Sequence, residues 1–290
     1  MQEVIQLALP GGTAWFRFGG HSDRGTVRRL NEDRFLAALP VFVVADGMGG
    51  HAFGDCASQA AVDVFAKEFG GTTHATAQQV LETIHRANAA VLATTGDSGE
   101  VSGTTLSGVA FVEIGSTDSR YWMVFNVGDS RIYSWDGRSL LQLSVDHSAV
   151  QELVNLGEIT RSEADTHRDR NIVTRALGAD AVVDPDIWLL PARGRRTFLV
   201  CSDGLTKELS DDEISRIIVF HGVEQVRGSD GLPISLAERL VNAAVSVGGS
   251  DNVTVVIVES DLVGSGWECV ENTVERDAMP GFLEETKPRG

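Results

Sequence analysis

Hydrophobic residues occur along this chain in short runs, and glycine and aspartate interrupt them. Short runs rich in β-branched and aromatic residues predict β-strands. Six such runs are FVVA (42–45), TLSGVAFVEI (105–114), YWMVFNV (121–127), RIYSW (131–135), TFLVCS (197–202) and NVTVVIVES (252–260). No apolar stretch approaches the ~18 residues of a membrane-spanning helix, so we expect none.

A different spacing marks the helices. In residues 76–92, the apolar positions recur at the spacing of one helix face, which predicts an amphipathic helix. Those positions are Val80, Ile84, Ala87 and Val91. Hydroxyl residues followed three positions later by Gln or Glu match the capping box that begins many helices. Such pairs are Thr76/Gln79, Thr160/Glu163, Ser210/Glu213 and Ser235/Glu238.

The last of these pairs opens a predicted helix with an apolar stripe of Leu236, Leu240 and Val247. This helix is expected to end at Gly248-Gly249, since glycine often follows the last helical turn. Strands and helices therefore come in groups without regular β-α-β alternation. That order predicts an α+β fold with largely antiparallel sheets covered by helices. No Pro/Ser-rich linker divides the chain, which indicates one domain.

The charge balance bears on the choice of partner. The chain has 24 basic and 41 acidic residues, a formal net charge of −17, which argues against a nucleic acid or an anionic membrane as partner. Cys56, Cys201 and Cys269 are far apart and form no CxxC pair, as expected for a reducing compartment. The first residues do not read as a signal peptide. We therefore expect a cytoplasmic protein.

Acidic residues recur where predicted strands end or begin. Asp46 and Asp203 each follow an apolar run and precede glycine, Asp129 lies in a short turn between two strands, and Asp251 precedes the last strand. Taken singly, each residue is typical of a turn or a cap. Folding can bring all four to one sheet edge, where their mutual repulsion favours a bound cation. Oxygen ligands select hard divalent ions such as magnesium, calcium or manganese.

A second group of charged residues lies in SDRGTVRRLNEDRF, residues 22–35. Its arginines, among them Arg28, precede Glu32 and Asp33. Mixed charge of this kind is usual on a solvated face. Beside a metal cluster, however, the planar guanidinium of an arginine can donate two hydrogen bonds to phosphate oxygens.

Taken in order, the motifs resemble the metal-dependent type 2C serine/threonine protein phosphatase (PPM) family in its bacterial form. The stretches that carry the resemblance are GTVRRLNEDRF, VVADGMGGHAFGDCAS, SGTTL, NVGDSRIY, DHS, NIVTRALG, CSDGL and SDNVTVVIV. They cover about residues 18–260. The resemblance implies an α-β-β-α sandwich, in which two mainly antiparallel sheets are flanked by helices. It also implies an enzyme that hydrolyses phosphoserine and phosphothreonine with two Mn²⁺ or Mg²⁺ ions.

The resemblance also implies roles for individual residues. Asp46 would bridge both metals, the Gly47 carbonyl would bind one of them, and Asp203 and Asp251 would bind the other. Asp129, with help from Asp203, would hold the third metal of many bacterial relatives. Arg28 would bind the substrate phosphate. Glu32 would bind the metals through a water molecule, and Asp33 would support Glu32.

The expected mechanism is direct attack on phosphorus by metal-bound hydroxide, with no cysteine or serine nucleophile. Eukaryotic relatives have a histidine after the Asp-Gly, proposed as general acid. This chain has Met48 there, which cannot donate a proton. Water on a metal or His51 would have to replace it. His147, in DHS, is expected to be structural.

We therefore assign residues 1–15 to an N-terminal segment, 16–261 to the catalytic domain and 262–290 to an acidic tail. Residues 146–182 would form a flap beside the cleft. The expected partners are phosphorylated proteins, the opposing enzyme is a serine/threonine kinase, and the protein is a monomer. Two alternatives remain: a sporulation-type relative with one dedicated substrate, and a binding module on an inactive phosphatase fold. A calcium-binding structural protein is disfavoured because no EF-hand loop is present.

Overall fold

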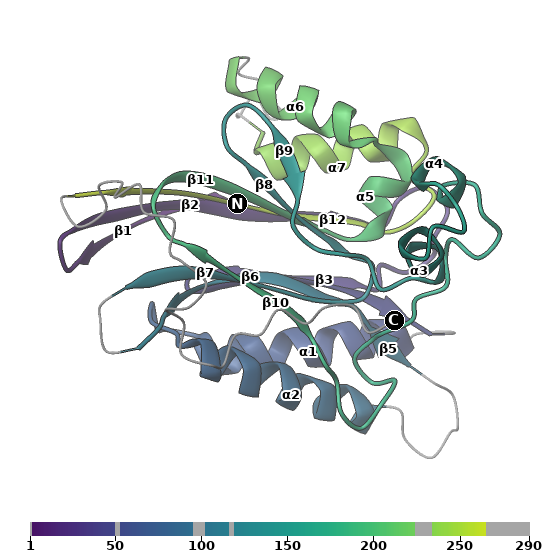
Figure 1. The fold of residues 1–290 in the computed structure, drawn as a ribbon, viewed down its shortest axis with the longest axis horizontal. Helices are drawn as coiled ribbons and strands as arrows, with labels where there is room; N and C mark the ends of the chain where they lie inside the picture. The colour runs from purple at the N-terminus through teal and green to yellow at the C-terminus, as the bar shows by residue number, and fades with distance from the viewer. Residues whose placement is uncertain (1, 50–52, 95–101, 116–118, 224–233, 265–290) are drawn as a thin grey trace.

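The computed structural model describes residues 2–49, 53–94, 102–115, 119–223 and 234–264. Two sheets lie face to face, and a layer of helices covers the outer side of each (Figure 1). Every pair of neighbouring strands within these ranges runs antiparallel. The predicted α+β class and the α-β-β-α arrangement are confirmed. Among the described helices, none has the length and apolarity needed to cross a membrane.

Sheet A combines strands from both ends of the chain. In spatial order it contains β1 (Gln2–Leu9), β2 (Gly12–Asp23), β12 (Val253–Val263), β11 (Gly194–Cys201), β8 (Arg131–Trp135) and β9 (Leu140–Gln142). Sheet B contains β10 (Asp186–Pro191), β7 (Arg120–Val127), β6 (Leu106–Glu113), β4 (Val41–Met48) and β3 (Asp33–Ala38), and the short β5 (Gly103–Thr104) pairs with β4. All six predicted strands therefore exist.

Alternation along β4 explains why its apolar run is continuous. Val41, Val43 and Ala45 face the helices below sheet B, whereas Phe42 and Val44 face sheet A. Successive side chains of a strand point to opposite faces, so a strand packed on both sides is apolar throughout. Aromatic rings fill the space between the sheets, with Trp122 and Phe198 4.9 Å apart between ring centroids.

Two helices cover the outer face of sheet B: α1 (Phe53–Phe69) and α2 (Ala77–Thr94) (Figure 1). The four apolar positions predicted for α2 are all buried. The Thr76/Gln79 capping box is present, with the Thr76 amide 2.9 Å from Gln79 Oε1 and the Gln79 amide 3.2 Å from Thr76 Oγ1.

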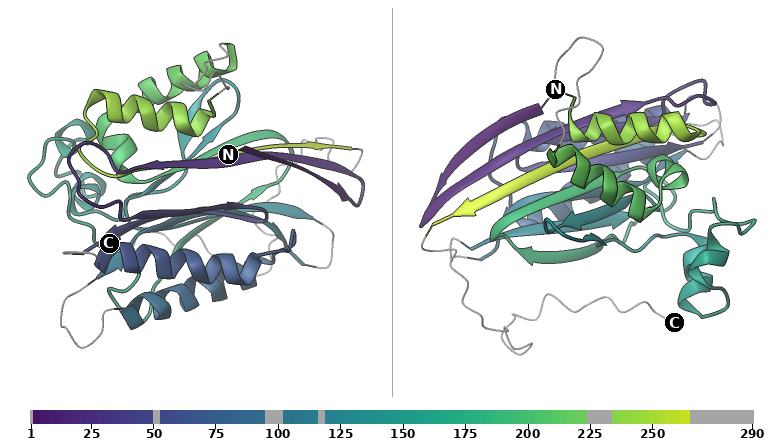
Figure 2. Two further views of the ribbon diagram at one scale, coloured as in Figure 1. Left: turned by 180° about the vertical axis from the view of Figure 1, so that it is seen from behind. Right: turned by 90° about the horizontal axis from the view of Figure 1, so that it is seen from above.

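Three helices cover sheet A: α5 (Asp203–Glu208), α6 (Asp211–Val223) and α7 (Leu236–Val247) (Figure 2). As predicted, α7 begins after Ser235 and ends at Gly248. The predicted apolar stripe of α7 is wrong at Val247, which is 66% exposed. The buried face of α7 consists instead of Leu236, Ala237, Leu240, Val241 and Ala244.

Both assigned domain boundaries fall within strands of sheet A. β2 lies inside sheet A between β1 and β12, and Ala14 is fully buried. A boundary after residue 15 therefore cuts a strand, because Ala14, Phe16 and Phe18 alternate into the same core. At the other end, β12 continues through Val263. Residues 265–290 of the assigned tail lie outside the described residues.

Candidate active site

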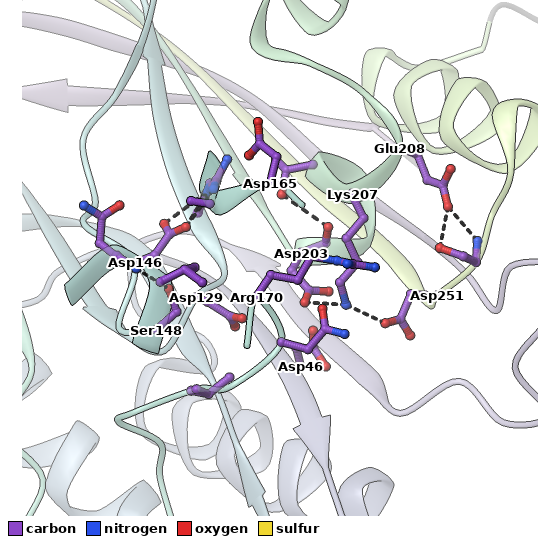
Figure 3. A pocket seen from close by; sticks show the side chains of 18 of the residues that line it. Asp46, Asp129, Asp146, Ser148, Asp165, Arg170, Asp203, Lys207, Glu208 and Asp251 are labelled. Atoms are coloured by element: carbon purple, nitrogen blue, oxygen red, sulfur yellow. Dashed lines mark hydrogen bonds and ion pairs between the residues drawn. The ribbon is translucent and has the colours of Figure 1, made fainter. Parts of the chain in front are cut away.

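The four acidic residues predicted at strand ends lie in one cleft. Asp46 is near the end of β4, Asp129 follows β7, Asp203 begins α5 directly after β11, and Asp251 precedes β12. All four line a cavity of ≈ 1270 Å³ at one end of the two sheets (Figure 3). Each sheet contributes, because β4 and β7 belong to sheet B and β11 and β12 belong to sheet A.

Burial and mutual repulsion make these carboxylates hard to ionise. Asp33 pairs directly with Asp46 across β3 and β4, and like charges in that position repel. Burial, reinforced by Asp33, Asp203 and Asp129, raises the pKa of Asp46 well above its usual value. Burial, with the charge of Asp203, raises the pKa of Asp33 to about 6 and that of Asp129 to about 7. The site therefore favours bound positive charge.

Two basic side chains already supply part of that charge. The Lys207 ammonium lies 2.6 Å from Asp203 Oδ2 and 2.8 Å from Asp251 Oδ2. Arg28 also contacts Asp251, with Nε 2.8 Å from Oδ1 and Nη2 2.9 Å from Oδ2. Burial alone would raise the pKa of Asp251, but the hydrogen bond from Lys207 and the charges of Lys207 and Arg28 lower it.

Two carboxylate oxygens nevertheless remain without partners. Asp33 Oδ1 and Asp203 Oδ1 are buried and accept no hydrogen bond within the described part of the chain. Buried oxygens of this kind are rare in native structures and call for an explanation such as an ion. Together with the all-oxygen donor set, they fit a hard divalent cation. No three His, Cys, Asp or Glu side chains of the described ranges already surround a point as metal ligands do.

Asn252 fixes the loop that carries Arg28. Its amide nitrogen donates to the backbone oxygens of Arg24 and Leu30, each at 2.9 Å, and its oxygen accepts from the Glu32 amide at 2.9 Å. The neighbour of Asp251 thereby clamps the loop over the cleft. Glu32 lines the cleft, and its burial raises its pKa.

Buried hydroxyls hold the backbone around the acids. Ser202 donates to Asp33 Oδ2 at 2.7 Å and accepts from the Thr254 amide at 3.0 Å, which links β11, β3 and β12. On the sheet B side, Thr105 Oγ1 accepts from the Asp46 amide at 2.9 Å and lies 2.8 Å from Ser130 Oγ, beside Asp129.

The glycine after Asp46 is required by packing. A Cβ on Gly47 would lie 2.1 Å from the Gly54 carbonyl oxygen and 2.7 Å from that of Glu32. No larger residue fits there, because β4, the start of α1 and the Glu32 segment meet at that point. Binding of a metal by the Gly47 carbonyl, which the family resemblance implies, stays a prediction.

Comparison with known proteins agrees with this geometry. Residues 21–241 match the family model described as Protein phosphatase 2C. The chain is 34% identical over 255 residues to the serine/threonine phosphatase stp of Listeria monocytogenes, covering 84% of this chain and 96% of that protein. It is 36% identical over 251 residues to the phosphatase PstP of Mycobacterium tuberculosis, covering 85% of this chain and 45% of that protein.

The chain belongs to the protein phosphatase 2C family. Solved structures of similar proteins include the PPM Ser-Thr phosphatase MsPP from Mycobacterium smegmatis in complex with cacodylate (35% identity, TM-score 0.70, covering 83% of this chain and 97% of that one). Another is the catalytic domain of PstP with two manganese ions (32% identity, TM-score 0.70, covering 86% and 99%). The resemblance noted from the motifs is thus confirmed, as is the classification as a metal-dependent serine/threonine phosphatase.

The predicted flap stands beside the cleft of this phosphatase. It contains α3 (Ala149–Asn155) and α4 (Arg161–Ala164), which lie beyond the ends of the sheets (Figure 2). Its two stems pair, since the Ala149 amide donates to Ile172 O and the Thr174 amide to His147 O, both at 2.9 Å. His147 is buried, accepts from the Gly128 amide at 3.0 Å and pairs with Asp186. These contacts agree with the structural role expected for His147.

Met48 lines the cleft, while His51 lies outside the described residues. Lys207 and Asn252 were not among the predicted site residues. A signal for Lys207 was available, because it lies four residues after Asp203 at the spacing of a helical ion pair. Nothing in the one-dimensional pattern indicates that Asn252 clamps the loop of Arg28, since these residues meet only in the folded chain.

Proposed function

We propose that this phosphatase hydrolyses phosphoserine and phosphothreonine in proteins at a centre of two divalent ions held by Asp46, Asp203 and Asp251. The observation that carries this proposal is the convergence of these three acids in one cleft beside Arg28. The partnerless oxygens of Asp33 and Asp203 support it further.

Two Mn²⁺ or Mg²⁺ ions held there would supply Lewis-acid chemistry, which lowers the pKa of a water molecule and offsets negative charge on phosphate oxygens. Asp46 and the Gly47 carbonyl would hold one side of this centre, with Glu32 joining through water and Asp33 in support. Asp129, together with Asp203, is the place for a third ion. Each of these groups supplies an oxygen, as hard cations require.

Arg28 would orient the phosphate. Its side chain is 48% exposed at the cleft. Burial lowers its pKa, but the charge and hydrogen bond of Asp251, together with the charges of Asp46 and Glu32, raise it overall. A planar guanidinium can bind two phosphate oxygens at once. Met48 lines the same cleft and has no proton to give, so the leaving alkoxide must be protonated by another group.

Phosphorylated proteins are the proposed substrates, and a serine/threonine kinase is the proposed opposing enzyme. The strongly acidic composition argues against nucleic acid and anionic membrane as partners. We further propose a monomer in the cytoplasm, the latter on the grounds of the three widely separated cysteines. Choice among substrates would involve the flap, whose residues Arg161 and Arg170 line the cleft.

The test is hydrolysis of a phosphoserine or phosphothreonine peptide by the purified chain with Mn²⁺, with Mg²⁺ and with a chelator. Turnover with either metal and its loss on chelation would support the proposal. Turnover that persists in chelator after removal of bound metal would contradict it. Metal binding without turnover on a broad phosphopeptide panel would favour the binding module, and turnover of one dedicated substrate would favour the sporulation-type alternative.

A further inference from the structure

Lys207 bridges two carboxylates of the cleft. It lies one helical turn after Asp203 in α5, and its ammonium contacts Oδ2 of Asp203 at 2.6 Å and Oδ2 of Asp251 at 2.8 Å. Figure 3 shows the three side chains directed toward one another beside Asp46. A single lysine thus joins the start of α5 to the residue that precedes β12.

The two oxygens that Lys207 contacts belong to the acids proposed to hold a divalent ion. An ammonium is a compact point charge with three donors, and it needs no further ligand to satisfy both carboxylates. A divalent ion placed between the same carboxylates would repel it. The lysine side chain is 31% exposed and lines the cleft, so its flexible stem allows the ammonium to swing into solvent.

We propose that Lys207 is a built-in counter-ion that holds Asp203 and Asp251 together and competes with the divalent ion for their oxygens. Lys207 thereby sets the metal concentration at which the site fills. This inference rests on the proposed function, because it takes Asp203 and Asp251 as metal ligands. It adds a residue of this chain that weakens metal binding and stabilises the metal-free protein.

The charges that face Lys207 agree with this role. Asp203 and Asp251 contact it, its charge offsets part of the rise in the pKa of Asp129, and Arg28 also contacts Asp251. Removal of the lysine leaves two neighbouring carboxylates with one basic partner. Their repulsion must then be offset by a metal ion or must destabilise the fold.

The experiment compares metal-free wild type with Lys207→Gln, Lys207→Arg and the control Lys67→Gln. Lys67 is exposed on α1, so its replacement changes the net charge equally without touching the cleft. Isothermal titration with Mn²⁺ gives the affinity, and thermal unfolding with and without Mn²⁺ gives the stability. We expect Lys207→Gln to bind Mn²⁺ roughly tenfold more tightly than wild type, which corresponds to about 1.4 kcal/mol.

The same variant should have a lower Tm than wild type in chelator and a larger increase of Tm with Mn²⁺. Lys207→Arg should stay close to wild type, and Lys67→Gln should match it. If Lys207→Gln does not fold without metal, Mn²⁺-loaded protein is mixed with chelator and the rate of Mn²⁺ release is measured. Release slower than from wild type supports the proposal, because no ammonium replaces the departing ion.

Equal Mn²⁺ affinity or equal release rates in wild type and Lys207→Gln would overturn the role of Lys207. Unchanged metal affinity with a raised KM would also overturn it, since the lysine would then contact substrate. If the proposed function itself is wrong, the experiment gives a different result. In that case wild type itself binds no Mn²⁺, or Asp203→Asn binds Mn²⁺ as tightly as wild type.

Discussion

Arg28 and Asp251, 223 positions apart in the chain, form a two-point ion pair in the cleft, with Nε 2.8 Å from Oδ1 and Nη2 2.9 Å from Oδ2. The residue proposed to bind phosphate therefore also contacts a proposed metal ligand. This arrangement would place a phosphate bound to Arg28 next to the proposed ions.

Replacement of Arg28 by alanine should weaken substrate binding more than metal binding. Charge-assisted hydrogen bonds contribute about 1.5–3 kcal/mol, so KM for a phosphopeptide should rise roughly ten- to hundredfold. Mn²⁺ affinity should change much less, because Arg28 is not itself a proposed metal ligand and contacts only one of them, Asp251. Steady-state kinetics and Mn²⁺ titration measure the two effects separately.

The matched control is Arg29→Ala, since Arg29 is exposed in the same loop. It should leave KM near the wild-type value. A loss of Mn²⁺ affinity in Arg28→Ala with an unchanged KM would remove Arg28 from the phosphate site.

Asn252→Ala should destabilise the fold and misplace the loop of Arg28. The change removes three part-buried hydrogen bonds to backbone groups of the loop. We expect the free energy of unfolding to fall by about 1–3 kcal/mol and KM to rise. Denaturant unfolding measures the first effect. The control Asn242→Ala, at an exposed position on α7, should leave the free energy of unfolding nearly unchanged. Equal stability of the two variants would contradict the role of Asn252 in holding the loop.

The stability of the metal-free protein should fall as pH rises from about 5 to about 7.5. The pKa is about 6 for Asp33 and about 7 for Asp129, both above the value of an unfolded aspartate. The folded state therefore holds more protons than the unfolded state in this window, and the free energy of unfolding decreases as they are lost. His221, whose pKa burial lowers, acts in the opposite direction.

Comparison of wild type with Asp129→Asn isolates the contribution of Asp129 to this pH dependence, because the amide does not titrate. Denaturant unfolding in chelator at several pH values should give a smaller decrease for this variant than for wild type. Saturating Mn²⁺ should reduce the decrease in wild type. Stability that rises equally with pH in both proteins would show that burial does not raise the pKa of Asp129.

Local patterns were sufficient to predict β4, α2 and the acids at strand ends. The apolar residues of FVVADG predict a strand, and its Asp-Gly predicts where that strand ends. The spacing of Val80 and Ile84 predicts one face of a helix. Because strand ends gather at the edges of sheets, the grouping of Asp46, Asp129 and Asp203 was also predictable.

Features that depend on distant partners were not predicted. The pairing of β2 with β12 joins the two ends of the described chain, so no local pattern could place residues 1–15 inside the sheet. α1 was missed because small residues such as Ala57 and Ser58 face sheet B and leave a weak apolar stripe. Asn252 contacts the loop of Arg28, and Lys207 contacts Asp251. Both contacts join residues that are far apart in the sequence, so they form only in the folded chain.

The central claim is that divalent ions held by Asp46, Asp203 and Asp251 enable hydrolysis. Asp203→Asn tests it most directly, because an amide replaces one buried carboxylate at nearly constant shape. The measurement is phosphopeptide turnover at saturating Mn²⁺, with circular dichroism to verify the fold and Asp63→Asn, exposed on α1, as control. We expect kcat to fall more than about a hundredfold in a folded protein, since a catalytic metal supplies several kcal/mol. Wild-type turnover in folded Asp203→Asn would contradict it.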